Sequence, residues 1–197
     1  MRLSDIYSTL ARTIPGGQAD VTITSLTVDS RQVQPGACFI AVRGGTQDGH
    51  RFIPEARAGG AAVILGEDPD PRLGGAYIQV EDSRLALAKL AAAWHGHPAR
   101  SLVMIGVTGT DGKSTTCNLL YQILLKAGIA TGMITTVNAI IGDEVQDTGL
   151  HVTTPDALEV QGYLRRMVAA GMSHCILETT SHGLAQHRVS ACDFDLA

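Results

Sequence analysis

The chain has 197 residues, which at about 150 residues per domain allows one large domain, or one domain plus part of a second. Hydrophobic residues make up 45% and charged residues 17%, so the composition predicts a globular core and excludes extended disorder. The net charge is -4, and the sequence lacks the basic cluster that a nucleic acid partner requires and any apolar stretch of about 18 residues that could span a membrane. We therefore expect a cytoplasmic protein with no nucleic acid or membrane partner. We also expect it to be monomeric.

The glycine and cysteine contents indicate which kinds of site the chain can form. Glycine accounts for 22 of the 197 residues, about 11% against a usual share of about 7%, which favours tight turns where the backbone approaches a ligand. The four cysteines contain no C-x-x-C pair, so neither a zinc ribbon nor a thioredoxin-type motif is available. We expect each of them to be a small buried apolar residue: Cys38, Cys117, Cys175 and Cys192.

The first half of the chain reads as a small α/β domain. Hydrophobic spacing predicts helices over residues 3–11, 48–58 and 83–95, and strands over 23–30, 38–42, 61–65 and 76–80. Gly96-His97-Pro98 ends the last of these helices. We therefore place a domain boundary there and assign residues 1–98 to an N-terminal domain.

A new pattern begins at Ser101. It predicts strands over 102–107, 130–135 and 174–180, and helices over 113–127 and 155–170, an order typical of a parallel sheet with crossover helices. The polar stretch 137–150 is expected to form a hairpin or loop over the carboxyl edge of this sheet. Residues 194–197 resemble the opening of another strand. Because three strands are fewer than the usual five or six, we expect residues 99–197 to be the truncated start of a larger domain.

The strongest motif lies between the strand 102–107 and the helix that follows it. It reads Gly106-Val107-Thr108-Gly109-Thr110-Asp111-Gly112-Lys113-Ser114-Thr115, which is typical of a phosphate-binding loop (P-loop). The glycines let backbone N–H groups face phosphate oxygens, Lys113 reaches the β- and γ-phosphates, and the Ser114 or Thr115 hydroxyl takes Mg²⁺. The strict pattern needs glycine at Val107, so the loop is a variant of it.

A second motif, Glu178-Thr179-Thr180-Ser181-His182-Gly183, stands at the carboxyl end of a predicted parallel strand. Ligands of open α/β sheets bind at that edge. We expect Glu178 to emerge beside the P-loop, where its carboxylate can hold Mg²⁺. Read without the P-loop, the same residues are equally consistent with a helix-capping cluster.

A third motif, Asp29-Ser30-Arg31, ends the predicted strand 23–30 and is followed by Pro35-Gly36 and Asp48-Gly49-His50. A hydroxyl and a guanidinium at a strand end can bind an anionic group. Asp29 and Arg31 can equally form a surface ion pair, so this motif alone decides nothing.

Together these motifs resemble those of the Mur ligase family, and the MurE type within it. The resemblance also includes Thr153-Thr154-Pro155 and the run Glu178-Thr179-Thr180-Ser181-His182-Gly183-Leu184 leading into Gln186-His187-Arg188-Val189, which favours the MurE type over its sister ligases. It covers nearly the whole chain. Members of the family have three domains, which bind a UDP-sugar, ATP and the incoming amino acid in that order.

The resemblance implies an ATP-dependent ligase of peptidoglycan precursor synthesis. The reaction joins a diamino acid, meso-diaminopimelate or L-lysine, to UDP-N-acetylmuramoyl-L-alanyl-D-glutamate through an acyl phosphate, with ATP and Mg²⁺ as cofactors. The implied catalytic residues are Lys113 and Glu178, and the implied metal ligands are Ser114 and Glu178. The ATP contacts would be Gly109, Thr110, Asp111, Gly112, Lys113, Ser114 and Thr115; the UDP contacts Val28, Ser30, Gly45, Thr46 and Gln47; and the muramoyl-peptide contacts Thr153, Thr154, Thr180, Gln186 and Arg188.

One departure from the family and two alternative functions remain. Asp111 stands where the family usually has asparagine, which adds a negative charge beside the phosphates. The alternatives are another P-loop ATPase, such as a kinase or GTPase, and a fragment that binds nucleotide-sugar and ATP without catalysis. A kinase or GTPase requires a Walker-B strand ending in aspartate or a base-reading motif, and we find neither in the sequence. We expect the 197 residues alone to be inactive as a ligase.

Overall fold

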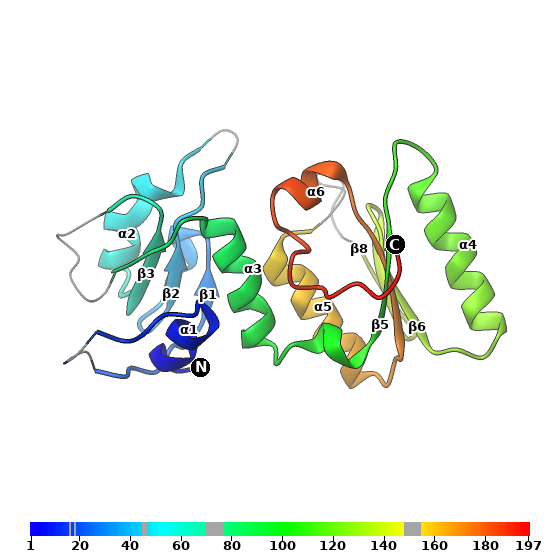
Figure 1. Ribbon diagram of the computed structural model, residues 1–197, viewed down its shortest axis with the longest axis horizontal. Helices are drawn as coiled ribbons and strands as arrows, with labels where there is room; N and C mark the ends of the chain where they lie inside the picture. The colour runs from blue at the N-terminus through cyan, green and yellow to red at the C-terminus, as the bar shows by residue number, and fades with distance from the viewer. Residues whose placement is uncertain (16, 18, 45–46, 70–76, 148–154) are drawn as a thin grey trace. The chain divides into compact units, whose positions relative to one another are not determined.

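The computed structural model describes residues 1–15, 17, 19–44, 47–69, 77–147 and 155–197. The chain divides into two compact units, Met1–Leu90 and Ala91–Ala197 (Figure 1). A four-stranded sheet forms the first unit and a five-stranded sheet the second. The expected fold class, α/β with parallel sheets, is confirmed. The functional division at residue 98 stays a prediction.

The sheet of the first unit is entirely parallel, in the order β1-β2-β3-β4. Its strands are β1 (Leu26–Thr27), β2 (Cys38–Ile40), β3 (Val63–Gly66) and β4 (Tyr77–Gln79). The helices are α1 (Leu3–Thr9), α2 (Ile53–Ala58) and most of α3 (Ser83–Trp94), whose last residues belong to the second unit. The 3-10 turns are η1 (Ser30–Gln32) and η2 (Gly49–Phe52). Because the strands are parallel, the segments that leave their carboxyl ends share one edge of the sheet.

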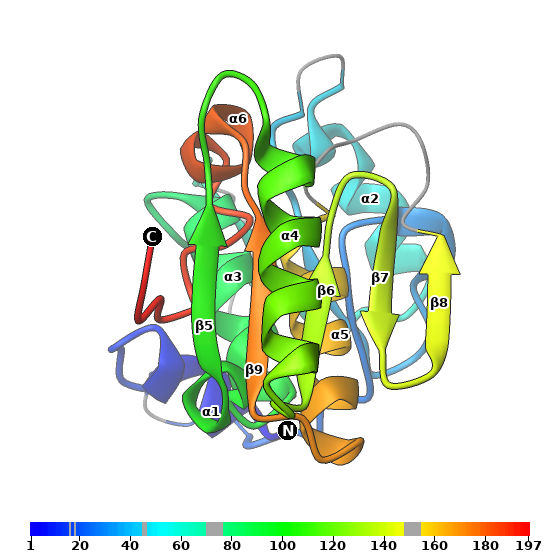
Figure 2. The ribbon, with the colours of Figure 1, turned by 90° about the vertical axis from the view of Figure 1, so that its right-hand side faces the viewer.

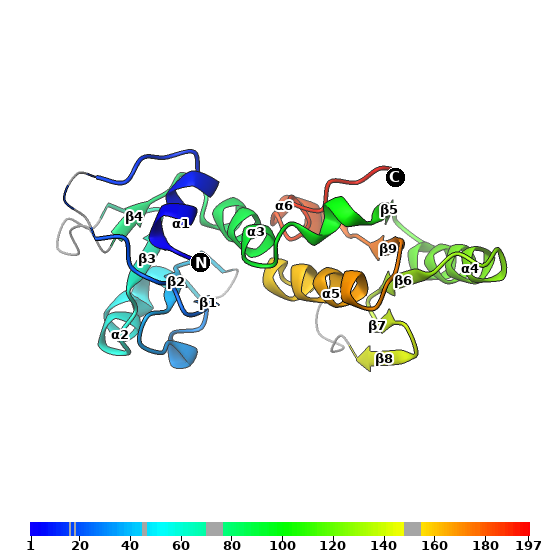
Figure 3. The ribbon, with the colours of Figure 1, turned by 90° about the horizontal axis from the view of Figure 1, so that it is seen from below.

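Alternating residues of the central strands form the core of the first unit. Phe39 and Ile64 pack with Ile53 and Ala56 of α2. Ile40, the residue after Phe39 in β2, is also fully buried and lies on the other face of the sheet. Figure 3 shows α1 and α2 on opposite sides of this sheet.

The second unit has three parallel strands and an antiparallel hairpin, in the order β5-β9-β6-β7-β8. The strands are β5 (Val103–Val107), β6 (Thr131–Ile134), β7 (Asn138–Ile141), β8 (Glu144–Asp147) and β9 (His174–Glu178). The helices are α4 (Lys113–Lys126), α5 (Ala157–Ala169) and α6 (Ser181–Ala185), and a 3-10 turn η4 (Pro98–Ser101) precedes β5. This arrangement puts the segments after β5, β6 and β9 at one edge.

Helices cover both faces of the second sheet, α4 on one and α5 on the other (Figures 2 and 3). Neighbouring residues of β9 point to opposite faces: Ile176 packs with Tyr121 of α4, and Leu177 with Leu164 of α5. This period of two fixes the register of β9, because a slip by one residue would exchange the two faces. The register in turn sets the direction of Glu178, the residue that follows Leu177.

Several predicted boundaries are wrong, and local hydrogen bonding explains why. The strand predicted over 23–30 is reduced to Leu26–Thr27, because Asp29 accepts a hydrogen bond from the Arg31 N–H and starts η1. The helix predicted over 48–58 begins as the 3-10 turn η2 and becomes α-helical only at Ile53, next to Pro54. The strand predicted over 174–180 ends at Glu178, because Thr180 caps α6.

The segment 137–150 is a hairpin as far as the structure describes it, but its expected place over the carboxyl edge is wrong. β7 pairs with β6 and β8 with β7, so the hairpin widens the sheet sideways. The second sheet therefore has five strands and is not purely parallel. At the other edge, Leu196 forms a parallel bridge with Ile105. Its backbone also hydrogen-bonds to Met104 and Gly106, so the strand expected over 194–197 pairs with β5 for part of its length.

All four cysteines are free and buried, as predicted. Burial raises the pKa of the Cys38, Cys117 and Cys192 thiols to about 12, so they are protonated and unreactive at neutral pH. Among the described residues, no helix combines the length and apolar character needed to cross a membrane.

A capping box starts α5 and offers a test of the helix boundary. Asp156 Oδ1 accepts the Glu159 N–H at 2.9 Å, and the Glu159 side chain accepts the Asp156 N–H. We expect Asp156→Ala to lower the free energy of unfolding by about 1 kcal/mol, since the cap is lost. Urea denaturation followed by circular dichroism measures the change, and Asp156→Asn, which retains a capping oxygen, should recover most of it. Equal losses in the two variants would contradict the capping role.

Candidate functional site

The P-loop prediction concerns the turn between β5 and α4. Gly109 has φ +145° and Gly112 has φ +76°, conformations that L side chains rarely adopt, so both positions favour glycine. Gly112 is also the N-cap of the 14-residue helix α4, whose first N–H groups point along the helix axis toward the loop. The loop thus places free N–H donors and a helix N-terminus together, the combination that binds phosphate.

Lys113 is the first residue of α4, and its side chain folds back across the loop. Its Nζ donates to the Gly109 carbonyl at 2.9 Å and to the Thr110 carbonyl at 3.2 Å. An ammonium group has three donors, so one remains for a phosphate oxygen. The neighbouring Asp111 is exposed.

Glu178 lies at the end of β9 and is the most buried carboxylate of the candidate site, with 2% of its surface exposed. The Ser114 hydroxyl lies 3.0 Å from its Oε1 and 2.9 Å from its Oε2, and the Thr136 N–H donates to Oε2 at 3.1 Å. The three residues come from α4, β9 and the segment after β6. Glu178 therefore lies beside the P-loop, as expected, although its carboxylate is buried.

The Ser114 and Glu178 oxygens fit a magnesium ion by their chemistry. Mg²⁺ prefers hard oxygen ligands and is usually bound through one or two carboxylates together with substrate phosphates. One hydroxyl and one carboxylate directly beside a P-loop match that preference. The bound ion would neutralise charge on the nucleotide phosphates.

A cavity of about 490 Å³ opens beside the loop. One wall is formed by the P-loop and the other by the start of α6, and its lining residues are Thr108, Gly109, Thr110, Lys113, Thr180, Ser181 and His182. Because β5 and β9 are adjacent parallel strands, their following segments form the two walls directly. The cavity therefore lies at the sheet edge where nucleotide phosphates bind in such folds.

The described muramoyl-peptide candidates form two groups along the chain after β9. Thr180 caps α6, with its Oγ1 accepting the Gly183 N–H at 3.0 Å, and it also lines the cavity. Gln186 and Arg188 contact each other, since Gln186 Oε1 accepts from Arg188 Nε at 3.1 Å and from Arg188 Nη2 at 2.7 Å. Thr153 and Thr154 lie outside the described residues.

The UDP candidates belong to the first unit. Val28 is 37% exposed just after β1. The Ser30 hydroxyl donates to Glu55 Oε2 at 2.6 Å, and Asp29 pairs with Arg31 at 2.7 Å, a hydrogen bond that lowers the pKa of the Asp29 carboxyl. The Asp29–Arg31 ion pair is therefore present, and the Asp29-Ser30-Arg31 motif can still bind an anionic group as well. Gln47 is exposed, and Gly45 and Thr46 lie outside the described residues.

Sequence reasoning missed two residues of the site. Thr136 holds Glu178 through its backbone N–H, and His182 lines the cavity. Thr136 directly follows a predicted parallel strand, so its place at the carboxyl edge was a usable signal. His182 lies within the motif Glu178-Thr179-Thr180-Ser181-His182-Gly183, but the sequence assigns it no contact of its own.

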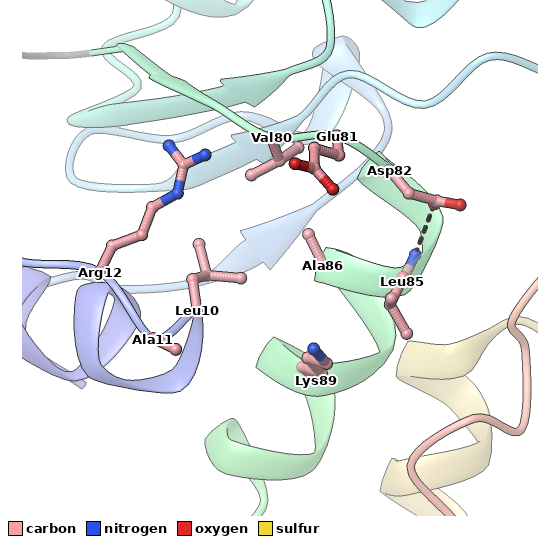
Figure 4. Close-up of a pocket in the computed structure, with 9 residues that line it drawn as sticks. All are labelled: Leu10, Ala11, Arg12, Val80, Glu81, Asp82, Leu85, Ala86 and Lys89. Carbon is pink, nitrogen blue, oxygen red and sulfur yellow. Dashed lines mark hydrogen bonds between the residues drawn. The ribbon is translucent and has the colours of Figure 1, made fainter.

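A second cavity, of about 290 Å³, lies in the first unit between the end of α1, the end of β4 and the start of α3. Figure 4 shows Arg12 reaching from the end of α1 toward Val80 and Glu81. Asp82 uses one oxygen to accept the Leu85 N–H at 2.8 Å. The lining carries charges of both signs and none of the predicted site residues, so we do not include it in the candidate site.

The fold and loop define a P-loop protein with a second, smaller α/β unit, and sequence comparison specifies the class. The model described as "Mur ligase family, catalytic domain" matches residues 22–95, and "Mur ligase middle domain" matches residues 107–197. Together they cover most of both units. The chain belongs to the Mur ligase family.

Curated relatives agree with this assignment. The chain is 44% identical to a UDP-N-acetylmuramyl-tripeptide synthetase of Deinococcus radiodurans, over 100% of the chain and 41% of the relative. It is 40% identical to a UDP-N-acetylmuramoyl-L-alanyl-D-glutamate–2,6-diaminopimelate ligase of Cytophaga hutchinsonii, over 98% of the chain and 40% of the relative. The chain thus spans about two fifths of the length of these relatives.

Solved structures support the fold. A UDP-N-acetylmuramoyl-L-alanyl-D-glutamate–2,6-diaminopimelate ligase superimposes with a TM-score of 0.78 at 23% identity, over 100% of this chain and 40% of that one. A MurF ligase from Thermotoga maritima, solved in complex with ADP, gives a TM-score of 0.53 at 28% identity, over 87% of this chain and 36% of that one.

Proposed function

We propose that this chain contributes the UDP-sugar-binding domain and part of the ATP-binding domain of a MurE-type ligase. The activity is ATP-dependent addition of a diamino acid to UDP-N-acetylmuramoyl-L-alanyl-D-glutamate, a step of peptidoglycan precursor synthesis. ATP and Mg²⁺ are its cofactors. We further propose that the protein acts as a monomer in the cytoplasm, where ATP is supplied, without a nucleic acid or membrane partner.

The observation that carries this proposal is the contact between Ser114 of the P-loop and Glu178 at the end of β9. A P-loop alone is compatible with many nucleotide-binding proteins. Here the carboxylate comes from the end of the strand next to the loop, and Thr180 of the same segment lines the cavity. Nucleotide and acceptor substrate would therefore meet between two adjacent strand ends.

The residues would act by alignment and charge stabilisation. The loop N–H groups, the α4 N-terminus and Lys113 bind the phosphates as the terminal phosphoryl group moves to the acceptor carboxylate. Ser114 and Glu178 would hold Mg²⁺, which neutralises phosphate charge when bound. Arg188, a planar bidentate donor, would bind a substrate carboxylate, with Gln186 orienting its guanidinium. No covalent protein nucleophile is needed.

Ligand titration tests the division of labour between the two units. We expect UDP-N-acetylmuramoyl-L-alanyl-D-glutamate to shift the amide NMR signals of Val28 and Ser30, because these residues follow β1 at the carboxyl edge of the first sheet. ATP with Mg²⁺ should instead shift the amides of residues 109–115. Unchanged Val28 and Ser30 signals at saturating UDP-sugar would contradict the UDP assignment, and the ATP titration serves as the internal control.

A further inference from the structure

Residues Val42–Gly44 and Gln47–Gly49 pair as two antiparallel arms at the carboxyl edge of the first sheet, and we call these two arms the hairpin. The Gly44 N–H donates to the Gln47 carbonyl at 2.8 Å, and the Gly49 N–H donates to the Val42 carbonyl at 2.9 Å. Arg43 and Asp48 form an antiparallel bridge between these two bonds. A Cβ at Gly49 would lie 2.7 Å from Val42 N and O, so the two arms are in close contact.

His50 follows this hairpin and connects it to the end of β3. Its side chain is 9% exposed. Nε2 accepts the Glu67 N–H at 2.8 Å, and Nδ1 lies 2.6 Å from Asp48 Oδ1. A backbone N–H can only donate, so Nε2 carries no proton, and Nδ1–H must be the donor to Asp48. The geometry therefore selects the neutral Nδ1–H tautomer of the imidazole.

Charged residues around the ring strengthen the same connection. Arg43 pairs with Glu67 at 3.3 Å and with Asp68 at 2.5 Å, and it lies 3.7 Å from Asp48. The Glu67 carboxylate in turn accepts from the Ser83 hydroxyl at 2.7 Å and the Ser83 N–H at 3.1 Å. The base of the hairpin is thereby tied to the end of β3 and the start of α3.

The same atoms raise the question of a metal site. One ligand atom each from Asp48, His50 and Asp68 lies within 4.8 Å of the others. Both ring nitrogens of His50 are already used within the protein, and the Arg43 guanidinium pairs with the carboxylates. The cluster is therefore complete as a hydrogen-bonded connection and does not require a cation.

We propose that His50 is a positioning residue for recognition of the UDP part of the substrate. Its neutral ring joins Asp48 at the hairpin base to the Glu67 N–H, and this fixes the direction of the hairpin that carries Gln47. The inference rests on the proposed function for its ligand. The connection between hairpin and sheet is measurable without any ligand.

Two substitutions separate the two hydrogen bonds of the ring. His50→Gln places an amide oxygen near the position of Nε2 and retains an acceptor for the Glu67 N–H. His50→Asn retains a donor near Nδ1 for Asp48 but cannot reach Glu67. We expect amide hydrogen exchange at Glu67 and Gly49 to rise about tenfold in His50→Asn and much less in His50→Gln. Affinity for UDP-N-acetylmuramoyl-L-alanyl-D-glutamate should fall about tenfold in His50→Asn, with partial rescue in His50→Gln.

Ring ¹⁵N NMR decides the tautomer, and the His50→Gln spectrum assigns the signal. An Nε2–H or doubly protonated ring at pH 7.5 would overturn the proposal, as would wild-type affinity for the UDP-sugar in His50→Asn. If the wild type did not bind the UDP-sugar while exchange at Glu67 and Gly49 changed as expected, the UDP assignment would fail and the hairpin connection would stand supported.

Discussion

Replacing Lys113 by alanine is expected to weaken ATP binding by at least about 100-fold. The ammonium group is a charged donor located within the loop, and charge-assisted hydrogen bonds of this kind contribute about 1.5–3 kcal/mol each. The substitution also removes the two bonds to the Gly109 and Thr110 carbonyls, which hold the loop in its present form. Isothermal titration calorimetry with ATP and Mg²⁺ measures the loss.

Binding of UDP-N-acetylmuramoyl-L-alanyl-D-glutamate provides the control for Lys113→Ala. Its UDP contacts are proposed for Val28 and Ser30 of the other unit, so its affinity should remain largely intact. Equal loss of both ligands would indicate a folding defect. Retained ATP affinity would remove the P-loop assignment. Lys126→Ala, at the exposed opposite end of α4, should bind both ligands as the wild type does.

The features that the sequence predicts well are those set by local pattern. The glycines of the P-loop and the Lys113-Ser114 pair are contiguous, so their spacing alone predicts a loop followed by a helix. Short apolar runs likewise predict β5 and β9, whose buried residues face helices on both sides. These elements lie within one or two residues of their predicted positions.

Features that depend on distant partners were missed. The contact of the Thr136 N–H with Glu178 is not visible locally, because it depends on the pairing of β6 with β9, strands that lie about 40 residues apart in the sequence. The buried state of Glu178 has the same origin. A carboxylate at the predicted edge was expected to be accessible, but helix α4 brings Ser114 directly onto it. Tertiary packing therefore determines both the Thr136–Glu178 contact and the burial of Glu178.

The Ser114–Glu178 pair leads to the second large effect. We expect Glu178→Gln to abolish the tightening of ATP binding by Mg²⁺, a loss of at least about 30-fold in the ratio of ATP affinities with and without the ion. A carboxylate is the ligand that Mg²⁺ favours in such sites, whereas a neutral amide supplies a weaker oxygen and no charge. Comparing this ratio between the wild type and Glu178→Gln separates a role in Mg²⁺ binding from a general role in nucleotide binding.

The fold should tolerate this substitution, because glutamine can replace each existing bond. Its amide oxygen can accept the Thr136 N–H, and its amide nitrogen can donate to the Ser114 hydroxyl. ATP without Mg²⁺ should bind Glu178→Gln as well as the wild type or better, since a negative charge near the phosphates is removed. Glu159→Gln, an exposed carboxylate on α5, is the matched control and should keep the full Mg²⁺ effect. A normal Mg²⁺ effect in Glu178→Gln would show that the ion binds elsewhere, and the Ser114–Glu178 site would have to be withdrawn.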